Sequence, residues 1–302
     1  MNRKLGMAFI ALVMMATSPS KMNAQSCVQH TNTISENLRF NESTYPYKDG
    51  LLIANFGTEQ LNPLNSEGKG YIVYSKEGKN SVLIPSDGFL SAPKGMFVRN
   101  GHLFVCDVNK VVVYNLDNPS LKPYIINMPE GNLFVNDLVA SGNNLYVSVT
   151  NTDKIYRIDI SDLSHIGAPV EWVKVAGPNG LLIEKEVMYI ASYPADGKTT
   201  DKNVIYRIAD LDRPRPERFI TVPGQYDGIA LSTNKEALYI TNWSPAQISK
   251  VDLKSKRMTP LNLSLKQDLV GPADISTANG MLYIPDLPNS RVVIVKEDDF
   301  LD

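Results

Sequence analysis

Four side chains with an oxygen atom able to bind a metal ion occupy the same position in four of the six copies of a sequence repeat. They are Glu42, Asn136, Asn179 and Asp227, and the other two copies have Lys94 and Ala273 at this position. Two carboxylates and two carboxamides, with no thiol or imidazole among them, suit a hard divalent cation, and calcium before the transition metals. Calcium takes about six to eight oxygens, so four protein ligands would leave positions open for water and substrate. These residues therefore predict a working cation site.

The repeat that carries these residues is a pair of β-strands. The stretch from Pro178 to Ser192 shows it clearly, as an apolar run, a polar turn and a second apolar run. An apolar triplet follows the equivalent position by nine residues in five copies and by eleven in the Asp227 copy. Successive positions are 52, 42, 43, 48 and 46 residues apart. Six repeats of this length, each built from short strands, predict an all-β fold, a six-bladed β-propeller.

The two ends of the repeat array indicate how the ring closes. The first five repeats continue with a third and a fourth strand, whereas the sixth ends after its third. A spare segment, Thr33 to Phe40, precedes the first repeat. It can supply the missing outer strand and so remove an open sheet edge. We predict that residues 25–302 form one propeller closed by this N-terminal strand, with a loop insertion at Gly57 to Lys69 in blade one.

The first strand of each propeller blade runs beside the central channel, so the repeated position should form a ring at one mouth. More ordinary interpretations remain open for its members. Asn-Gly and Asp-Gly pairs are common in turns, so each residue alone fits a turn as well as a ligand. Lys94 would either pair with Glu42 or contact an anionic substrate or a developing oxyanion.

The ring resembles the site of a known family. The motifs are Asn41-Glu42-Ser43, Val135-Asn136-Asp137, Pro178-Asn179-Gly180 and Tyr226-Asp227-Gly228. They are similar to those of the senescence-marker-protein, gluconolactonase and luciferin-regenerating family of six-bladed propellers, more distantly related to paraoxonases, although that family usually has Pro-Glu-Gly where this chain has Asn41-Glu42-Ser43. The resemblance implies one divalent cation, Ca²⁺ or alternatively Mg²⁺, Mn²⁺ or Zn²⁺, held by Glu42, Asn136, Asn179 and Asp227. Phe134 departs from the pattern, because sugar-lactone members can carry an arginine there.

The expected reaction is hydrolysis of a lactone or ester, a small-molecule substrate whose carbonyl the cation would polarise. Asp227 would orient the attacking water or take its proton, and Lys94 would contact the oxyanion. Polar residues at the ends of the second strands are predicted to bind substrate: Asn55, Asp107, Ser192, Asn242 and Asp286. Trp243 either forms a pocket wall or packs on the surface.

Other chemistries find little support in the sequence. The formal net charge is −2, which gives no reason to expect a nucleic-acid partner. The histidines His30, His102 and His165 lie outside the ring, so neither a zinc site nor a Ser-His triad is favoured. The alternative from a different class is a non-catalytic propeller that binds a protein or glycan, because propellers host many functions.

The N-terminus is typical of an export signal. Arg3 and Lys4 precede an apolar run, Met7 to Ala16, and Ala24 is a small residue suited to cleavage. We predict a signal peptide over residues 1–24 and a periplasmic or secreted protein with no transmembrane segment. Cys27 leaves a lipid anchor open, and the sequence does not decide whether Cys27 pairs with Cys106.

Overall fold

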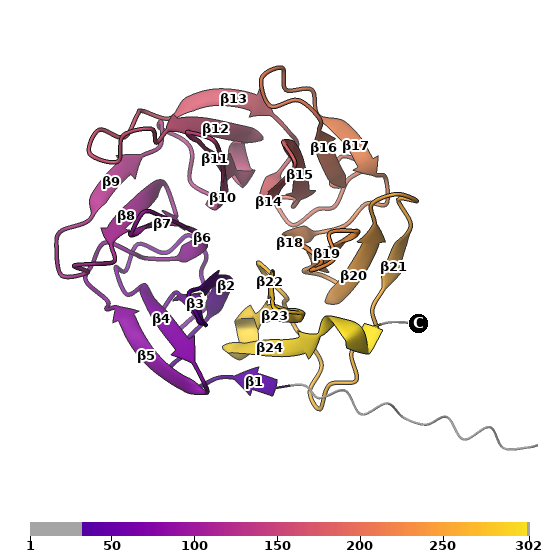
Figure 1. Cartoon of the computed structure of the whole chain (residues 1–302), viewed down its shortest axis with the longest axis horizontal. Coiled ribbons are helices and arrows are strands. Elements are labelled where there is room, and N and C mark those ends of the chain that lie inside the picture. Colours follow the sequence, from indigo (N-terminus) through magenta and orange to yellow (C-terminus); the bar gives the residue numbers. More distant parts are fainter. Residues whose placement is uncertain (1–31, 301–302) are drawn as a thin grey trace, which may run out of the picture.

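The computed structural model describes residues 32–300, which form a ring of six four-stranded antiparallel sheets (Figure 1). Blade one contains β2 (Asn41–Tyr47), β3 (Gly50–Asn55), β4 (Tyr71–Lys76) and β5 (Lys79–Ile84). Blade two contains β6 (Pro93–Arg99), β7 (His102–Asp107), β8 (Lys110–Asn115) and β9 (Tyr124–Asn127). Blade three contains β10 (Val135–Ser141), β11 (Asn144–Val149), β12 (Lys154–Asp159) and β13 (Val170–Lys174). The six-bladed propeller predicted from the repeat is confirmed.

The second half of the ring repeats this plan. Blade four contains β14 (Pro178–Glu184), β15 (Val187–Ser192), β16 (Ile205–Ile208) and β17 (Glu217–Ile220). Blade five contains β18 (Tyr226–Leu231), β19 (Ala237–Asn242), β20 (Gln247–Asp252) and β21 (Met258–Pro260). Blade six contains β22 (Ser276–Ala278), β23 (Met281–Asp286) and β24 (Arg291–Lys296). The only helices among the described residues are three 3₁₀ turns, η1 (Thr150–Thr152), η2 (Leu287–Asn289) and η3 (Glu297–Phe300).

An N-terminal strand closes the ring, as predicted. Strand β1 (Asn32–Ile34) pairs antiparallel with β24 and is the outermost strand of blade six. It is shorter than the predicted segment, because the chain turns after Ile34 and Leu38 packs into the core at the junction of blades one and six. On the channel side of that junction, the Ser43 hydroxyl donates a hydrogen bond to the Asp274 carboxylate at 2.6 Å. Residues far apart in the sequence therefore join the first blade to the last.

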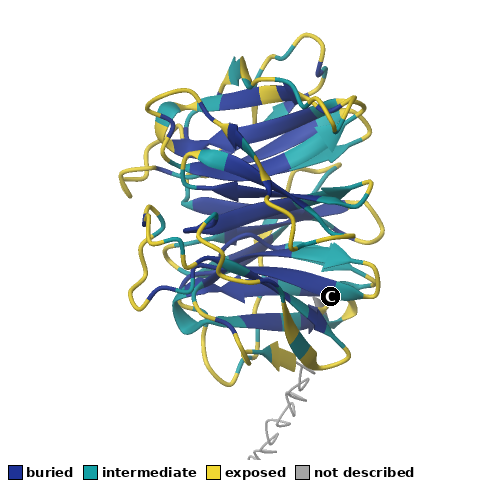
Figure 2. Ribbon diagram, turned by 90° about the vertical axis from the view of Figure 1, so that its left-hand side faces the viewer, coloured by how far each residue is buried: buried dark blue, intermediate teal, exposed yellow. Residues whose placement is uncertain are grey.

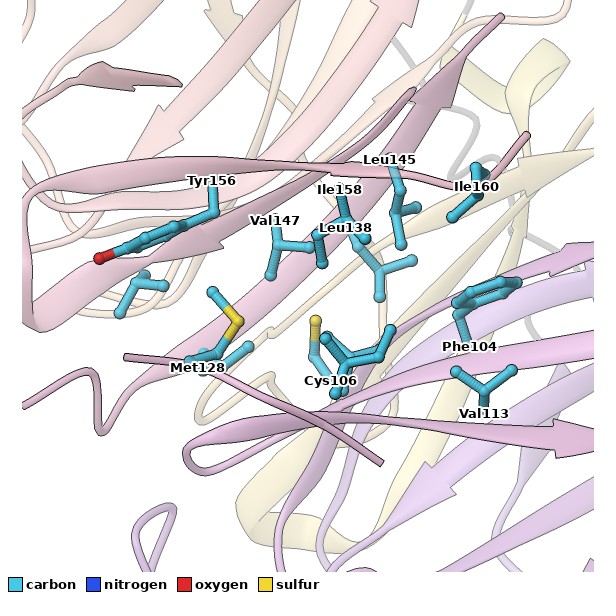
Figure 3. Close-up of a cluster of buried hydrophobic side chains, with 14 residues drawn as sticks. Phe104, Cys106, Val113, Met128, Leu138, Leu145, Val147, Tyr156, Ile158 and Ile160 are labelled. Carbon is cyan, nitrogen blue, oxygen red and sulfur yellow. The ribbon is translucent and has the colours of Figure 1, made fainter. Parts of the chain in front are cut away.

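The core lies between neighbouring blades. Alternating apolar residues of each sheet face the next sheet, which produces a series of separate hydrophobic clusters around the ring. Figure 3 shows the cluster between blades two and three, where Phe104 and Cys106 pack against Leu138 and Val147. Figure 2 shows that the buried strands run between faces made of exposed loops. One of those faces carries the candidate site.

Two predictions about the N-terminal part of the sequence fall outside the described residues. The predicted signal peptide, residues 1–24, and Cys27 both precede residue 32. Cys106 is free and fully buried in the cluster between blades two and three. Among the described residues, no helix has the length and apolar character needed to cross a bilayer.

Candidate metal centre

A cavity of about 60 Å³ lies at one mouth of the channel, where the inner strands begin. Figure 1 shows the inner strands β2, β6, β10, β14 and β18 arranged around the axis. The cavity is lined by Glu42, Phe56, Pro63, Lys94, Phe134, Asn136, Asn179, Tyr193, Asp227, Trp243 and Leu287. The structure thus brings the four predicted cation ligands and Lys94 together around one space. Ala273 is fully buried nearby, and packs with Phe56 and Leu287.

The five polar ring residues face this space because of a shared irregularity in strand pairing. Each is the second residue of its inner strand: Glu42 in β2, Lys94 in β6, Asn136 in β10, Asn179 in β14 and Asp227 in β18. In every one of these strands the register with the second strand shifts at this point. Such a β-bulge places an extra residue in one strand and redirects its side chain. The bulge, repeated from blade to blade, turns the ring residues into the channel.

The glycines after two ring residues serve close packing between blades. Gly180 and Gly228 lie inside β14 and β18, so the interpretation of Asn179-Gly180 and Asp227-Gly228 as turns is wrong. A Cβ atom at Gly180 would lie 2.5 Å from the carbonyl oxygen of Asp227. A Cβ atom at Gly228 would lie 2.4 Å from the backbone nitrogen of Ile275. The missing side chains let adjacent inner strands approach closely around the mouth.

Each of the four predicted ligands has a buried oxygen atom without a hydrogen-bond partner in the described part of the chain. Within residues 32–300, seven buried side-chain nitrogen or oxygen atoms lack a hydrogen-bond partner. Four of the seven are Glu42 Oε2, Asn136 Oδ1, Asn179 Oδ1 and Asp227 Oδ1. Leaving one buried acceptor unpaired costs about 1–3 kcal/mol, and more when it is charged, so four at one cavity point to a missing partner. A cation binds to acceptor atoms only, and these four oxygens are suitable ligands for a cation.

Burial and mutual repulsion disfavour charge on the two ring carboxylates in the cation-free protein. Burial raises the pKa of Glu42 well above its usual value, and the nearby carboxylates of Asp227 and Asp274 raise it further. Burial also raises the pKa of Asp227 to about 8, again with a contribution from Asp274. A doubly charged ion between the two carboxylates would reverse this effect, because an opposite charge at short range favours the ionised form.

Lys94 lines the cavity, and its hydrogen bonds go to backbone groups rather than to Glu42, the partner in one of its two interpretations. Its ammonium donates hydrogen bonds to the backbone carbonyls of Pro63, at 3.1 Å, and Ala92, at 2.9 Å. It also lies 5.6 Å and 5.5 Å from the ring centroids of Phe56 and Phe134. Over residues 32–300 no ion pair joins it to Glu42. Burial lowers the pKa of Lys94.

The five residues predicted to bind substrate lie elsewhere. Each is the last residue of a second strand: Asn55 in β3, Asp107 in β7, Ser192 in β15, Asn242 in β19 and Asp286 in β23. None of them lines the cavity. Their side chains instead bond to the segment that leads into the inner strand of the same blade. Asp286, for example, accepts hydrogen bonds from the backbone N–H groups of Val270 and Gly271.

Sequence reasoning missed part of the cavity wall by one residue. Phe56, Tyr193, Trp243 and Leu287 line the cavity, and each directly follows one of the second-strand residues just described. Successive side chains of an extended chain point in opposite directions, which was the signal that could have identified them. The pocket-wall interpretation of Trp243 agrees with its position in this lining.

Tyr193 is the wall residue with a polar tip. Its hydroxyl group has no hydrogen-bond partner among residues 32–300, and burial together with the Asp227 charge raises the pKa of Tyr193 to about 12. It therefore stays protonated over the physiological pH range and can donate a hydrogen bond into the cavity.

Ligands typical of transition metals do not gather in the part of the chain that the structure covers. No group of three or more His, Cys, Asp or Glu residues lies close enough there to hold an ion. His102 and His165 are absent from the cavity lining, and His165 contacts Asp162 on the surface. A cation at the channel mouth would thus depend on the two carboxamides as well as on the two carboxylates.

Sequence comparison gives no family for the chain, since no protein-family model and no curated protein matches it. Comparison of structures identifies other propellers. A gluconolactonase from Xanthomonas campestris is 13% identical, with a TM-score of 0.64 over 88% of this chain and 89% of that one. A catalytically inactive variant of virginiamycin B lyase from Staphylococcus aureus, with quinupristin, is 14% identical, with a TM-score of 0.58 over 88% and 98%. A Bacteroides thetaiotaomicron protein of unknown function is 11% identical, with a TM-score of 0.61 over 89% and 76%. At such identities the likeness concerns the fold.

Proposed function

We propose that this protein binds one divalent cation, calcium by preference, at the channel mouth and uses it to hydrolyse a lactone or ester. The observation that carries the proposal is the set of four unpaired buried oxygens, supplied by four separate blades to one cavity. Structural likeness to a gluconolactonase agrees with this proposal at the level of the fold. Calcium accepts about six to eight oxygens, so a substrate carbonyl and water can complete the coordination.

The residues of the cavity would have different roles in this reaction. Glu42, Asn136 and Asn179 would hold the cation, together with Asp227. When bound, the ion would polarise the substrate carbonyl as a Lewis acid. Asp227 would also orient the attacking water or accept its proton, since one of its oxygens is unpaired at the cavity.

Two further groups can act on the carbonyl oxygen as its negative charge grows. Tyr193 lines the cavity, and its hydroxyl would donate a hydrogen bond to that oxygen or to the leaving oxygen. Lys94 uses two of its three N–H donors on backbone carbonyls. Its ammonium also lies near the rings of Phe56 and Phe134, and its positive charge would favour the developing oxyanion and an anionic product.

We propose hydrolysis rather than elimination because no histidine among residues 32–300 lines the cavity. The lyase neighbour was crystallised as a catalytically inactive histidine-to-alanine variant, so that lyase depends on a histidine. The cavity of this protein has none among its lining residues. Hydrolysis requires only a base for water, for which Asp227 is available.

The proposal is tested by measuring calcium binding and turnover on the same protein. Calorimetry should show one calcium per chain, and a panel of lactones and aryl esters should be hydrolysed with calcium but not with excess chelator. Asp227→Ala and Asn179→Ala should abolish the calcium-dependent hydrolysis. A bound ion with no turnover on any substrate would instead favour a non-catalytic propeller that binds a protein or glycan. Absence of calcium binding would overturn the proposal.

The place of action follows from the N-terminal sequence. We propose that the protein is exported, because Arg3, Lys4 and the apolar run Met7 to Ala16 have the order of a signal peptide. N-terminal sequencing of the mature protein, recovered from the periplasm or the medium, tests this. An N-terminus within residues 25–27 is expected, and recovery of the intact chain from the cytoplasm alone would contradict it.

A further inference from the structure

The walls of the cavity are apolar, apart from the groups already assigned to the cation and the carbonyl. Phe56, Pro63, Phe134, Trp243 and Leu287 supply most of the lining that the ring residues do not. Phe56 is fully buried and packs in one cluster with Ala273 and Leu287. Trp243 packs against the same cluster. The wall is therefore a fixed part of the fold at the mouth.

Further apolar side chains are exposed in the loops on the same face as the cavity. Nine large apolar side chains are exposed in residues 32–300, and five of them are Leu61, Leu64, Leu133, Val222 and Val270. All five lie in loops at the mouth, either in the blade-one insertion or in segments that lead into inner strands. Leu133, Val222 and Val270 are each at least half exposed. Apolar side chains gathered around a cavity commonly mark a binding surface for an apolar group.

A polyhydroxylated substrate finds few partners here. Each hydroxyl buried without a hydrogen bond weakens binding, because it loses its water without compensation. The ring oxygens are committed to the cation under the proposed function, and the Lys94 ammonium already bonds to Pro63 and Ala92. Polar residues that might have bound hydroxyls, such as Asn55 and Asp286, bond to the backbone instead.

From these observations we infer that the substrate is a lactone or ester with an apolar alkyl or aryl substituent, which lies against Phe56, Phe134 and Trp243 and extends toward Leu133 and Val270. This inference rests on the proposed hydrolase function for its reacting group. The apolar wall itself is independent of that function, since it is present whether or not a cation binds. The two statements can thus be tested separately.

A series of δ-lactones with lengthening alkyl chains tests the wall through turnover. Each methylene buried against the wall should raise kcat/KM about fourfold, by the usual free energy of burying a methylene. We expect this rise from δ-hexalactone to δ-octalactone, a smaller rise to δ-decalactone, and much lower kcat/KM for glucono-δ-lactone. A flat series, or a preference for glucono-δ-lactone, would overturn the inference and leave the hydrolase proposal standing.

Substitutions in the wall test whether the rise of kcat/KM with chain length comes from contact with the wall residues. Trp243→Ala and Phe134→Ser should each flatten the series while changing δ-hexalactone hydrolysis much less than δ-decalactone hydrolysis. The matched control is Val82→Ser, at an exposed valine on outer strand β5, which should leave the series unchanged. Phe134→Ser provides the answer if Trp243→Ala folds poorly, because Phe134 is only partly buried. A series equally steep in all three folded variants would place the apolar contact elsewhere and overturn the inference.

A binding measurement keeps the inference testable if the chain hydrolyses no lactone. Alkyl-substituted δ-lactams resist hydrolysis, and their affinity for the protein can be measured by calorimetry with calcium and with chelator. Affinity that rises with chain length and is reduced by Phe134→Ser supports the apolar wall. Affinity independent of chain length overturns it. Absence of turnover on every lactone would count against the proposed function only.

Discussion

Two circles of polar side chains surround the same mouth of the channel, and they differ in what their oxygen atoms contact. The inner circle consists of Glu42, Asn136, Asn179 and Asp227, and the outer one of Asn55, Asp107, Ser192, Asn242 and Asp286. Both contain carboxylates and carboxamides, and all but Asn242 are buried. Every inner residue has a buried oxygen without a partner, whereas the outer residues bond to backbone groups of their own blade.

This difference separates a binding role from a structural one. A buried polar atom that is paired within the chain stabilises the fold. A buried acceptor that is left unpaired destabilises it until a ligand arrives. Residue type and burial are similar in the two circles, so neither property identifies the site. The hydrogen-bond partners do, and the following substitutions should affect function in one circle and stability in the other.

The largest expected effect is on activity in the inner circle. Asp227→Ala should lower calcium-dependent kcat/KM about a thousandfold or more, because the contribution of the cation to carbonyl activation is worth several kcal/mol. Steady-state hydrolysis of a lactone substrate measures this. The unfolding midpoint in chelator should stay the same or rise, since a buried carboxylate with an unpaired oxygen has been removed. Full activity in this variant would show that the inner circle does not have the proposed binding role.

The next largest effect is on stability in the outer circle. Asp286 is fully buried, accepts hydrogen bonds from Val270 and Gly271, and forms an ion pair with Arg291 at 2.8 Å. Asp286→Ala leaves the largely buried guanidinium of Arg291 without its carboxylate, so the free energy of unfolding should fall by about 3 kcal/mol. Urea denaturation measures the change. If Asp286→Ala also lost about 3 kcal/mol of calcium binding free energy, the outer circle would not differ in role from the inner circle.

Calcium should stabilise the unmodified protein through the inner circle. At a calcium concentration of about 100 times the Kd, the free energy of unfolding should rise by about 2.7 kcal/mol relative to chelator. Thermal unfolding with and without calcium measures this. Asn179→Leu, which removes one unpaired oxygen, should reduce the calcium-dependent shift, whereas Asn55→Leu in the outer circle should leave the shift intact and lower both midpoints.

Calcium affinity should depend on pH. Burial raises the pKa of Asp227 to about 8, so below that pH its carboxyl group is protonated in the cation-free protein. Binding then has to displace protons from Asp227 and from Glu42, whose pKa burial also raises, so affinity should weaken by at least about tenfold for each pH unit below about 8. Calorimetry between pH 6 and 9 gives the profile. Asp227→Asn should make the profile shallower and leave the part due to Glu42, and an unmodified protein with pH-independent affinity would contradict the assignment.

The smallest expected effect compares two carboxamides. Asn242 accepts a hydrogen bond from the Gln225 backbone at 2.7 Å and donates one to Pro245. Asn242→Ala should therefore lower the free energy of unfolding by about 1–2 kcal/mol. Asn179→Ala, which removes an unpaired oxygen, should change it by less in chelator. Parallel denaturant titrations test the pair, and a larger loss for Asn179→Ala would reverse the interpretation of the inner circle.

Much of the architecture was predictable from local patterns. The spacing of the apolar triplets predicted six blades, and the absent fourth strand of the last repeat predicted closure by the N-terminal segment, which β1 confirms. Equivalence between repeats also placed Glu42, Asn136, Asn179 and Asp227 in one ring, and these four line one cavity. Each of these inferences uses only the period of the strands, which a few neighbouring residues specify.

The cavity wall and the role of Lys94 were not predictable in the same way. The residues expected to bind substrate were placed one position too early, because the alternation of side chains along the second strands was not followed past their ends. The missed wall residues Phe56, Tyr193 and Leu287 come next in the chain, as does Trp243, for which the wall was one of two interpretations. The partners of Lys94 include Pro63, 31 residues away in the blade-one loop. Nothing in the repeat specifies where that loop lies.

The sequence by itself determined the blade count, the strand that closes the ring and the positions that meet on the axis, because these follow from the periodic spacing of apolar residues. The tertiary structure alone decided which polar atoms are paired and which are left for a ligand. Pairing depends on contacts between segments distant in the chain, such as the 2.6 Å bond from the Leu181 N–H to Asp137, 44 residues earlier. It also depends on the bulges that turn the ring residues inward, and neither feature is specified by residue type alone.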